Sequence, residues 1–485
     1  MSEGKVTDAE ARFEAALRRH GFWLGPAAAV LVFALSGGLE PAQQILSAVM
    51  VFCAVYWITE PIPMAATALV AAALCVVTGV ASDKEAFAAF GNPLLFLFVG
   101  SFFLAEAMQV HGLGQRLADA VSRVARGRLS LVIALSGSAC LMSMWMSNVA
   151  ATAVTLPIAV AAAAATGDKR LGTALVLAVA YGASVGGIAT PVGTPPNLIG
   201  IGALRAAGHD VEFLRWMTLC VPMAAIMLGA LWLVLGATLG IRPGQPLPRA
   251  EERARRPWSR GEISVVAAFG LAIAGWLTPG VFEAVAPASA ATAWFRDHLT
   301  EEVVALLAGC SLFVLPGHAR GEEPRPVLTW REAAGIDWGV ILLFGGGILL
   351  GALAKSTGLS VVWGEAMIGL TGADSTWTLT ALVTAASIIL SEATSNTATA
   401  TLAAPLAISL AEAAGVSVVP PALGATLGAS FGFMLPISTG PNAMAYATGL
   451  VRVPQMMRAG IVFDVLGFLI ILAGLRLLCP LLGLG

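Results

Sequence analysis

Hydrophobic positions along this 485-residue chain form long runs that short polar stretches separate. Runs of about 20 residues, the length that crosses a bilayer as a helix, begin near Phe22, Ala42, Ile62, Pro93, Trp216, Ile263, Glu302, Trp338 and Gly460. Polar or Gly/Pro clusters interrupt two further long stretches. The pattern predicts an all-α polytopic membrane protein with about eleven passages, including two re-entrant helical hairpins.

A polar dipeptide occurs twice at predicted membrane depth. Ser147-Asn148 recurs as Ser395-Asn396, each inside an apolar stretch and each at the same distance from a following proline, Pro157 and Pro405. An unsatisfied hydrogen-bonding group in the hydrocarbon region costs several kcal/mol. A single Ser or Asn in such a helix usually bonds a neighbouring helix or its own backbone. Duplication at matched positions instead favours a binding role.

The two halves of the chain match beyond this dipeptide. At a nearly constant shift, Leu97-Phe98-Val99-Gly100 corresponds to Leu343-Phe344-Gly345-Gly346, Gly112-Leu113 to Gly358-Leu359, Gly182-Ala183-Ser184 to Gly428-Ala429-Ser430, and Gly193-Thr194-Pro195-Pro196-Asn197 to Ser438-Thr439-Gly440-Pro441-Asn442. The predicted order is a cytoplasmic N-terminal helix (1–20), a first half (21–240) with a hairpin at 129–165 and a broken helix at 171–205, a cytoplasmic linker (241–261), and a second half (262–485) with a hairpin at 376–412 and a broken helix at 420–450.

Charge orients the predicted helices, because cytoplasmic loops near a membrane are rich in Lys and Arg. With the N-terminus inside and the C-terminus outside, all but six of the 27 basic residues lie inside; the six are Lys84, Arg205, Arg215, Arg296, Lys355 and Arg476. The first hairpin then enters from inside and the second from outside, so the repeats are inverted. Inverted repeats with broken helices at matching positions indicate a secondary transporter with a mid-membrane site. The N-terminal segment is charged and lacks an apolar signal peptide, and the membrane is predicted to be the cytoplasmic one.

Composition supports a membrane protein. The chain is 58% hydrophobic and 12% charged, which excludes a soluble enzyme. A net charge of −2 gives no reason to expect nucleic acid as a partner. The histidines and cysteines show no metal-ligand spacing, and no cofactor is predicted beyond Na+ as a coupling ion.

Residue types at the duplicated motifs point to ions. Freed backbone carbonyls, Ser hydroxyls and Asn amide oxygens can replace the hydration shell of a small hard cation, whereas helix N-termini attract an anion. Ser143, Ser147 and Asn148 have a spacing that places them near one face of a helix end, and Ser391, Ser395 and Asn396 repeat it. Uncharged ligands leave each bound cation with its full charge, so the pattern predicts that two sodium ions attract the anion.

Four motifs resemble those of the divalent-anion:sodium symporter family of dicarboxylate, citrate and sulfate carriers. They are Ser-Met-Trp-Met-Ser-Asn at 143–148, Gly-Thr-Pro-Pro-Asn at 193–197, Thr-Ser-Asn-Thr-Ala-Thr at 394–399 and Leu-Pro-Ile-Ser-Thr-Gly-Pro-Asn at 435–442. The resemblance covers about residues 20–482. It implies a homodimer whose transport domains move as elevators against fixed scaffolds.

The same resemblance implies the site residues. It assigns the first sodium to Ser143, Ser147, Asn148 and a carbonyl near Gly193, the second to Ser391, Ser395, Asn396 and a carbonyl near Ser438, and the substrate carboxylates to Asn148, Thr194, Asn396, Thr397 and Thr439. Val149 stands where the family's first motif usually has Thr, so one hydroxyl is missing. Gly440 stands where the first copy has Pro195, which predicts a looser turn.

Other functions fit less well. Gly182-Ala183-Ser184-Val185-Gly186 and its counterpart at 428–432 match the Gly-x-Ser-x-Gly pattern of hydrolases, but no strand precedes either match and no histidine is nearby. A sodium/proton antiporter should have paired carboxylates at the site; Glu106 and Glu392 are the acidic residues nearest the middle of apolar stretches. A sodium-independent dicarboxylate exchanger would use the same residues. The sequence predicts sodium-coupled symport of a small dicarboxylate resembling succinate, malate or fumarate, with that exchanger, a citrate or sulfate carrier and the antiporter as alternatives.

Overall fold

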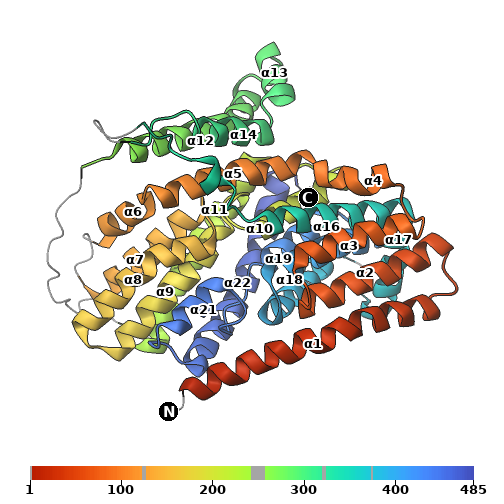
Figure 1. Ribbon diagram of the computed structural model, residues 1–485, viewed down its shortest axis with the longest axis horizontal. Helices are drawn as coiled ribbons and strands as arrows, with labels where there is room; N and C mark the ends of the chain where they lie inside the picture. The colour runs from red at the N-terminus through yellow and green to blue at the C-terminus, as the bar shows by residue number, and fades with distance from the viewer. Residues whose placement is uncertain (1–2, 123–126, 242–256, 319–323, 373–374, 485) are drawn as a thin grey trace.

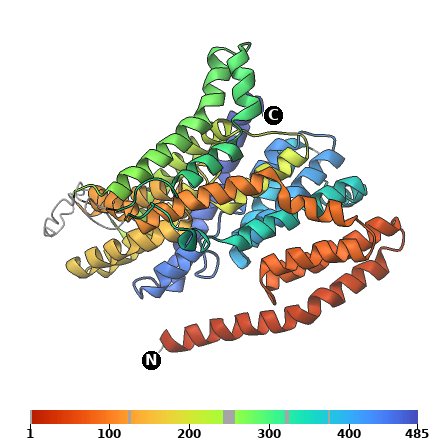
Figure 2. The same ribbon diagram turned by 45° about the horizontal axis from the view of Figure 1, so that its top comes forward.

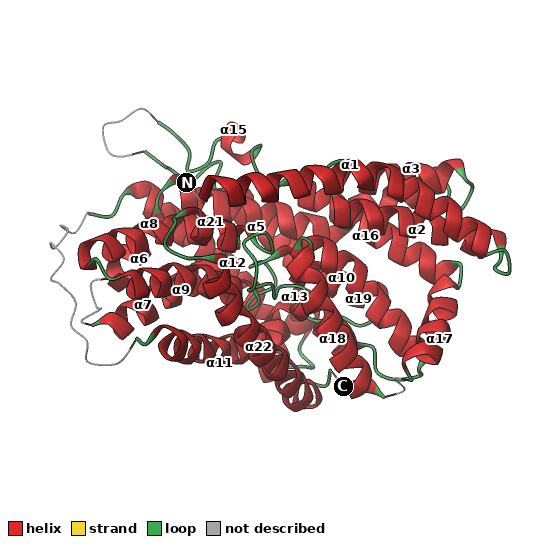
Figure 3. Cartoon of the chain, turned by 90° about the horizontal axis from the view of Figure 1, so that it is seen from below, coloured by secondary structure: helices red, strands yellow, loops and turns green. Residues whose placement is uncertain are grey.

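The chain folds into helices throughout the part that the structure describes. The computed structural model describes residues 3–122, 127–241, 257–318, 324–372 and 375–484, and these form helices α1 to α22 and one short 3-10 turn, with no strand (Figures 1 and 3). Nine helical stretches among them are long and apolar enough to cross a membrane: Pro41–Thr59, Asp83–Val110, Asn148–Thr166, Lys169–Gly187, Phe213–Leu239, Arg260–Glu283, Trp338–Ser356, Thr376–Ala393 and Val453–Leu481. The predicted all-α polytopic class is confirmed, and the number of passages stays a prediction.

The first half contains α1 to α11. Their bounds are α1 (Glu3–Leu35), α2 (Pro41–Thr59), α3 (Met64–Val77), α4 (Asp83–Ala88), η1 (Ala89–Gly91), α5 (Pro93–Val110), α6 (Leu113–Ser122), α7 (Arg128–Ser143), α8 (Asn148–Thr166), α9 (Lys169–Gly187), α10 (Pro195–Ala206) and α11 (Phe213–Leu239). The charged segment 1–20 is not a separate helix, because α1 continues without a break to Leu35 and lies beside α2 along one edge of the molecule (Figure 1).

The second half contains α12 to α22. Their bounds are α12 (Arg260–Val285), α13 (Ala290–His298), α14 (Glu301–Ser311), α15 (Trp330–Ala333), α16 (Trp338–Ser356), α17 (Leu359–Thr371), α18 (Thr376–Ala393), α19 (Asn396–Ala413), α20 (Val419–Gly428), α21 (Gly440–Ala447) and α22 (Val453–Leu481). The hairpin that contains α13 projects from the rest of the molecule at the top of Figures 1 and 2, whereas α14 packs against α5. Residues 242–256 of the predicted linker lie outside the described residues.

Helix contacts repeat between the halves in a reciprocal way. In the first half α7 packs on α9 and α8 on α9; in the second, α18 packs on α20 and α19 on α20. Contacts between the halves also occur in repeat-related pairs. Helix α5 packs on α14, as its counterpart α16 packs on α3. Helix α21 packs on α8, as its counterpart α10 packs on α19. Matching sequence segments thus occupy matching positions, and each broken helix packs beside the hairpin of the other half.

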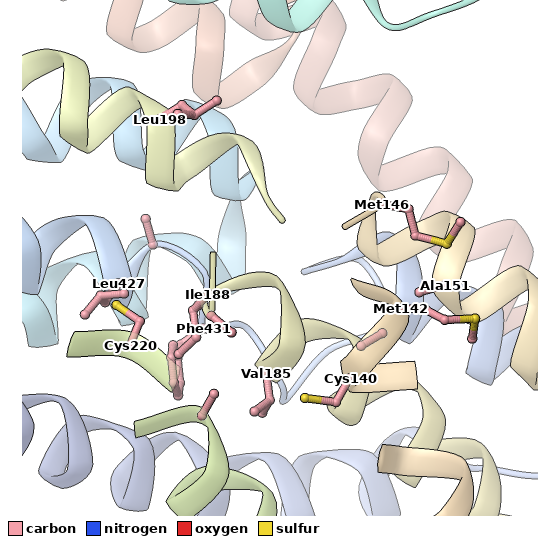
Figure 4. Packing of buried hydrophobic residues seen from close by; sticks show 14 of the residues in the cluster. Cys140, Met142, Met146, Ala151, Val185, Ile188, Leu198, Cys220, Leu427 and Phe431 are labelled. Atoms are coloured by element: carbon pink, nitrogen blue, oxygen red, sulfur yellow. The ribbon is translucent and has the colours of Figure 1, made fainter. Parts of the chain in front are cut away.

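Hairpins and broken helices form the centre of the molecule. In helix α9, 94% of the residues in an 18-residue stretch are buried, the highest share among the candidate spans. Figure 4 shows Cys140 of α7 facing Val185 of α9, and Ile188 beside Phe431, which lies between α20 and α21. Tyr181 of α9 donates a hydrogen bond of 2.6 Å to the carbonyl of Phe433 in the second broken segment. The two broken helices therefore pack directly against each other, which fixes the relative position of the two motif sets.

Candidate functional site

The first hairpin turns at the Ser-Asn motif. Helix α7 ends at Ser143, four residues form the turn, and α8 begins at Asn148, with the Ser147 hydroxyl accepting a hydrogen bond of 3.2 Å from the backbone amide of Ala150. Ser caps a helix well because its oxygen satisfies an amide that has no helical partner. The expectation that Ser143, Ser147 and Asn148 share one face of a helix end is wrong, because the helix stops between them.

The turn nevertheless brings two of these side chains together. The Ser143 hydroxyl donates a hydrogen bond of 2.6 Å to the amide oxygen of Asn148, and both residues are buried. Gly187, the last residue of α9, lies against the same amide: a Cβ there would be 2.4 Å from Asn148 Oδ1. A Cβ at Gly193 would be 2.8 Å from the carbonyl oxygen of Ser143. Uncharged oxygens thus gather where the hairpin tip meets the break between α9 and α10.

The second hairpin repeats this arrangement. Helix α18 ends at Ala393 and α19 begins at Asn396 after the N-cap residue Ser395. The Ser391 hydroxyl is in donor position to two oxygens, Asn396 Oδ1 at 2.8 Å and the carbonyl oxygen of Ala429 at 2.7 Å. The break between α20 and α21 is adjacent, because a Cβ at Gly432 would lie 3.2 Å from the carbonyl oxygen of Ser391. Each Ser-Asn pair therefore lies beside the broken helix of its own half.

One asparagine holds each broken helix together. Asn197 Nδ2 donates hydrogen bonds of 2.8 Å to the carbonyl oxygens of both Gly187 and Thr190. In the second copy, Asn442 Nδ2 donates to those of Gly432 at 2.9 Å and Leu435 at 3.0 Å. These carbonyls have lost their helical partners, and the amide replaces them. Both asparagines are part of the sequence motifs, but the sequence did not lead us to expect that they hold the broken helices together. Their matching positions in the two repeats were the signal that could have indicated this role.

Four helix N-termini border this region. Thr194 and Thr439 are the N-cap residues of α10 and α21, and Ser147 and Ser395 those of α8 and α19. Helix N-termini carry free amides and partial positive charge, which favour anions. The end of α21 touches the end of α8, because a Cβ at Gly440 would lie 2.5 Å from a methyl carbon of Val149. Val149 is 47% exposed, so it can meet a ligand.

Val149, which departs from the family pattern, and Gly440, which departs from the first copy of the repeat, are therefore neighbours. Gly440 lies next to Val149, and the missing side chain of the glycine provides the space that the valine methyl group fills. The repeat counterparts of Gly440 and Val149 are Pro195 in the first half and Thr397 in the second. The two ends of the site therefore differ in shape and in hydroxyl content, although their backbones match.

Glu392 distinguishes the second motif from the first. Its carboxylate accepts hydrogen bonds from the Ser438 hydroxyl at 2.5 Å and from the backbone amide of Met434 at 2.8 Å. The Ser438 hydroxyl also lies 3.0 Å from the Glu392 carbonyl oxygen. The corresponding position of the first motif holds Met144. The second motif thus has a buried acidic residue directly behind it.

Comparison with known proteins identifies the family. A family model described as "Citrate transporter" matches residues 54–420 and 291–483. The chain belongs to the citrate transporter family. This confirms the resemblance to divalent-anion:sodium symporters, and with it a membrane transporter and not an enzyme.

Named relatives agree with this assignment. A sodium-dependent dicarboxylate transporter, SdcS, of Staphylococcus saprophyticus is 30% identical over 95% of this chain and 91% of its own length. An uncharacterized transporter of Haemophilus influenzae is 31% identical over 91% of this chain and 94% of its own length. SdcS of Staphylococcus aureus is 29% identical over 88% of this chain and 84% of its own.

Solved structures show that this family member shares its fold with other transporters. The YdaH transporter of Alcanivorax borkumensis superposes with a TM-score of 0.55 at 16% identity, covering 81% of this chain and 86% of that one. MtrF of Neisseria gonorrhoeae, an antimetabolite efflux pump, gives a TM-score of 0.56 at 14% identity, covering 83% of each chain. At such identities the likeness concerns the fold alone.

Proposed function

We propose that this transporter carries a small dicarboxylate into the cell by coupling it to the inward sodium gradient. The observation that supports this most strongly is the duplicated Ser-Asn contact, Ser143 to Asn148 and Ser391 to Asn396, at two helix breaks that pack together. Paired uncharged oxygens beside free backbone carbonyls suit Na+, which takes oxygen ligands in place of its water.

In this proposal each motif holds one sodium ion. The first ion is bound by Ser143, Ser147, Asn148 and the Gly193 carbonyl, and the second by Ser391, Ser395, Asn396 and the Ser438 carbonyl. No charged ligand is among them, so each ion keeps its full charge close to the substrate. The motifs contain no Arg or Lys, so sodium and the helix N-termini supply the positive charge that attracts the substrate. Substrate affinity therefore depends on sodium.

The substrate carboxylates in turn contact Asn148, Thr194, Asn396, Thr397 and Thr439. Thr194, Thr397 and Thr439 are buried at the N-termini of α10, α19 and α21, where hydroxyls and free amides can donate to carboxylate oxygens. A dicarboxylate fits two matching ends, and the names of the SdcS relatives support that substrate class.

The wider setting follows from the same proposal. The protein lies in the cytoplasmic membrane with its N-terminus inside and its C-terminus outside, as a homodimer. Hairpins and broken helices form the moving domain of an elevator, because they share the central core, and the remaining helices form the scaffold. Partners are the small anion, sodium and lipid, without nucleic acid or a bound cofactor.

Four alternatives share the same fold. The family description favours citrate as the second candidate substrate, and a sulfate carrier is a further possibility within the same chemistry. A sodium-independent exchanger would use the same oxygens for substrate alone, and a sodium/proton antiporter would need acidic residues at the ion site.

Uptake into proteoliposomes distinguishes these functions. We expect purified protein in vesicles that contain no succinate to accumulate labelled succinate under an inward sodium gradient. No accumulation is expected when potassium or choline replaces sodium. Uptake that requires internal dicarboxylate and ignores sodium would instead establish the exchanger. Accumulation of labelled citrate or sulfate, with none of succinate, would change the substrate and leave the sodium coupling intact.

Val149→Thr is expected to change substrate preference. The hydroxyl adds a hydrogen-bond donor at an exposed position next to Gly440, and one such bond to a charged oxygen contributes about 1.5–3 kcal/mol. In competition assays, the concentration of unlabelled succinate, citrate or sulfate that halves the uptake of labelled succinate is measured. This concentration should shift by roughly 10-fold or more for the anion that reaches this hydroxyl. Val154→Thr on α8, outside the motif, is the matched control. Identical competition curves for Val149→Thr and the parent would remove this position from the substrate site.

A further inference from the structure

In each helix break, a side chain from outside the broken helix satisfies a backbone carbonyl. In the first half the carbonyl of Ile188, directly after α9, accepts a hydrogen bond of 3.0 Å from Nε1 of Trp216. In the second half the carbonyl of Phe433, between α20 and α21, accepts one of 2.6 Å from the Tyr181 hydroxyl. All four residues are buried. Such a carbonyl needs a donor within a membrane, because no water replaces the lost helical partner.

The two carbonyls occupy matching positions of the repeat, but their donors do not. Ile188 and Phe433 each follow the glycine whose carbonyl is held by the asparagine of the broken helix. The first break takes its donor from α11, in its own half, whereas the second takes it from α9, in the other half. Leu427, the repeat counterpart of Tyr181, has no donor group. The second break therefore depends on the first half for this bond, and the first break finds the equivalent bond within its own half.

Packing fixes the position of the Tyr181 ring. The ring meets that of Phe433 edge-on, with 4.9 Å between centroids, and stacks on that of Phe463 of α22 at 5.9 Å. Helix α22 also covers the bonded carbonyl, because a Cβ at Gly460 would lie 2.3 Å from the Phe433 oxygen. Closely packed interiors transmit displacement rather than absorb it. A movement of α9 at Tyr181 is therefore passed to the Phe433 peptide.

Helix α9, which carries Tyr181, also touches the first motif. It runs without a break over Lys169–Gly187, and a Cβ at Gly187 would lie 2.4 Å from Asn148 Oδ1. In the proposed function Asn148 is a ligand of the first sodium ion. A bound ion holds the amide in one place, and the close approach of Gly187 holds the end of α9 with it.

The Phe433 peptide in turn touches the second motif. Its neighbour Gly432 lies against two residues of that motif: a Cβ there would be 3.0 Å from Ser438 Cβ and 3.2 Å from the carbonyl oxygen of Ser391. Both serines are ligands of the second sodium ion in the proposed function. The bond from Tyr181 to Phe433 therefore joins the surroundings of the two sodium sites.

We propose that Tyr181 is a positioning residue that couples the two sodium sites. This inference rests on the proposed sodium-coupled transport and states how one bound ion assists the other. An ion at the first motif fixes α9, and the Tyr181 hydroxyl then holds the Phe433 peptide, so that the second motif is ordered before its own ion arrives. Because coupling between two binding sites is reciprocal, an ion at the second motif assists the first to the same extent.

Sodium binding to the purified protein tests the inference. We expect titration with radioactive sodium to show cooperative binding of two ions in the parent. Tyr181→Phe removes only the hydroxyl, so it should still bind two ions but without cooperativity. Its affinity for the second ion should be weaker by about 5-fold or more, the lower end of the usual range for coupled sites. Initial succinate uptake should then depend on sodium concentration along a less sigmoidal curve.

Two variants serve as controls. Tyr56→Phe is the matched one, because Tyr56 of α2 donates its hydroxyl to the carbonyl oxygen of Phe22 at 3.0 Å, outside both motifs. Trp216→Phe removes the equivalent bond of the first break, which lies within one half. Both should keep the cooperativity of the parent. The thermal unfolding midpoint of each variant reports any loss of stability separately from sodium binding.

The outcomes separate this inference from the proposed function. Unchanged cooperativity in Tyr181→Phe, or an equal loss in Tyr56→Phe, would overturn the inference. Independent binding of two ions by the parent would also overturn it, without any variant. Loss of cooperativity in Tyr181→Phe alone, in a protein that shows no sodium-driven succinate uptake, would support the coupling and overturn the transport function. A parent that binds no sodium would overturn both.

Discussion

Asn148→Ala and Asn396→Ala should each abolish sodium-driven uptake in a protein that still folds and inserts. The amide oxygen of each asparagine accepts a hydrogen bond from a serine hydroxyl, that of Ser143 or Ser391. In the proposed function each asparagine contacts both a sodium ion and the substrate. One contact to a charged group contributes about 1.5–3 kcal/mol. The loss of two such contacts lowers uptake by at least about 100-fold, at roughly 1.4 kcal/mol per factor of ten.

The measurement is initial uptake of labelled succinate at saturating and limiting sodium. Asn92→Ala is the matched control, because Asn92 caps α5 by accepting a hydrogen bond of 3.0 Å from the backbone amide of Leu94 and lies outside the motifs. Size-exclusion chromatography in detergent confirms folding of all three variants. Parental uptake by either motif variant would show that the residue concerned is not a ligand.

Gly187→Ala should be almost as damaging, although it removes no polar group. A Cβ at this position would lie 2.4 Å from Asn148 Oδ1 and 3.1 Å from Asn148 Cγ. Such a contact forces the amide away from Ser143, because the buried surroundings leave little space. We expect apparent sodium affinity to fall by about 30-fold or more, equivalent to roughly 2 kcal/mol of overpacking, and uptake to fall with it.

Gly137→Ala provides the control for Gly187→Ala. Gly137 lies in α7 of the same hairpin, and a Cβ there would meet no atom within 4 Å. The same chemical change in open space should leave sodium affinity unchanged. An unaltered sodium response in Gly187→Ala would mean that Asn148 does not need its present position, which would argue against the first sodium site.

Duplication within the sequence explains why the motifs could be predicted. Ser147-Asn148 and Ser395-Asn396 repeat in apolar surroundings, and two copies of a costly polar group are hard to explain by packing alone. The resemblance to the symporter family rested on motifs that contain the same residues. The assignment of individual residues to sodium or substrate stays a prediction that the variants above test.

Sequence spacing failed where the chain changes direction. Ser143, Ser147 and Asn148 have the spacing of a helix face, but α7 ends at Ser143 and α8 begins at Asn148. Periodicity assumes one continuous helix, so it cannot describe a turn. Likewise the charged segment 1–20 differs from the apolar residues that follow, yet α1 runs through both.

The sequence by itself determined the membrane class, the two repeats, the polar motifs inside apolar stretches and the family, because these depend on composition and local order. Only the tertiary structure placed Val149 against Gly440 and Tyr181 against Phe433. These pairs come from helices far apart in the chain. Their contact depends on close crossings at residues such as Gly460, where the absence of a side chain lets two backbones meet.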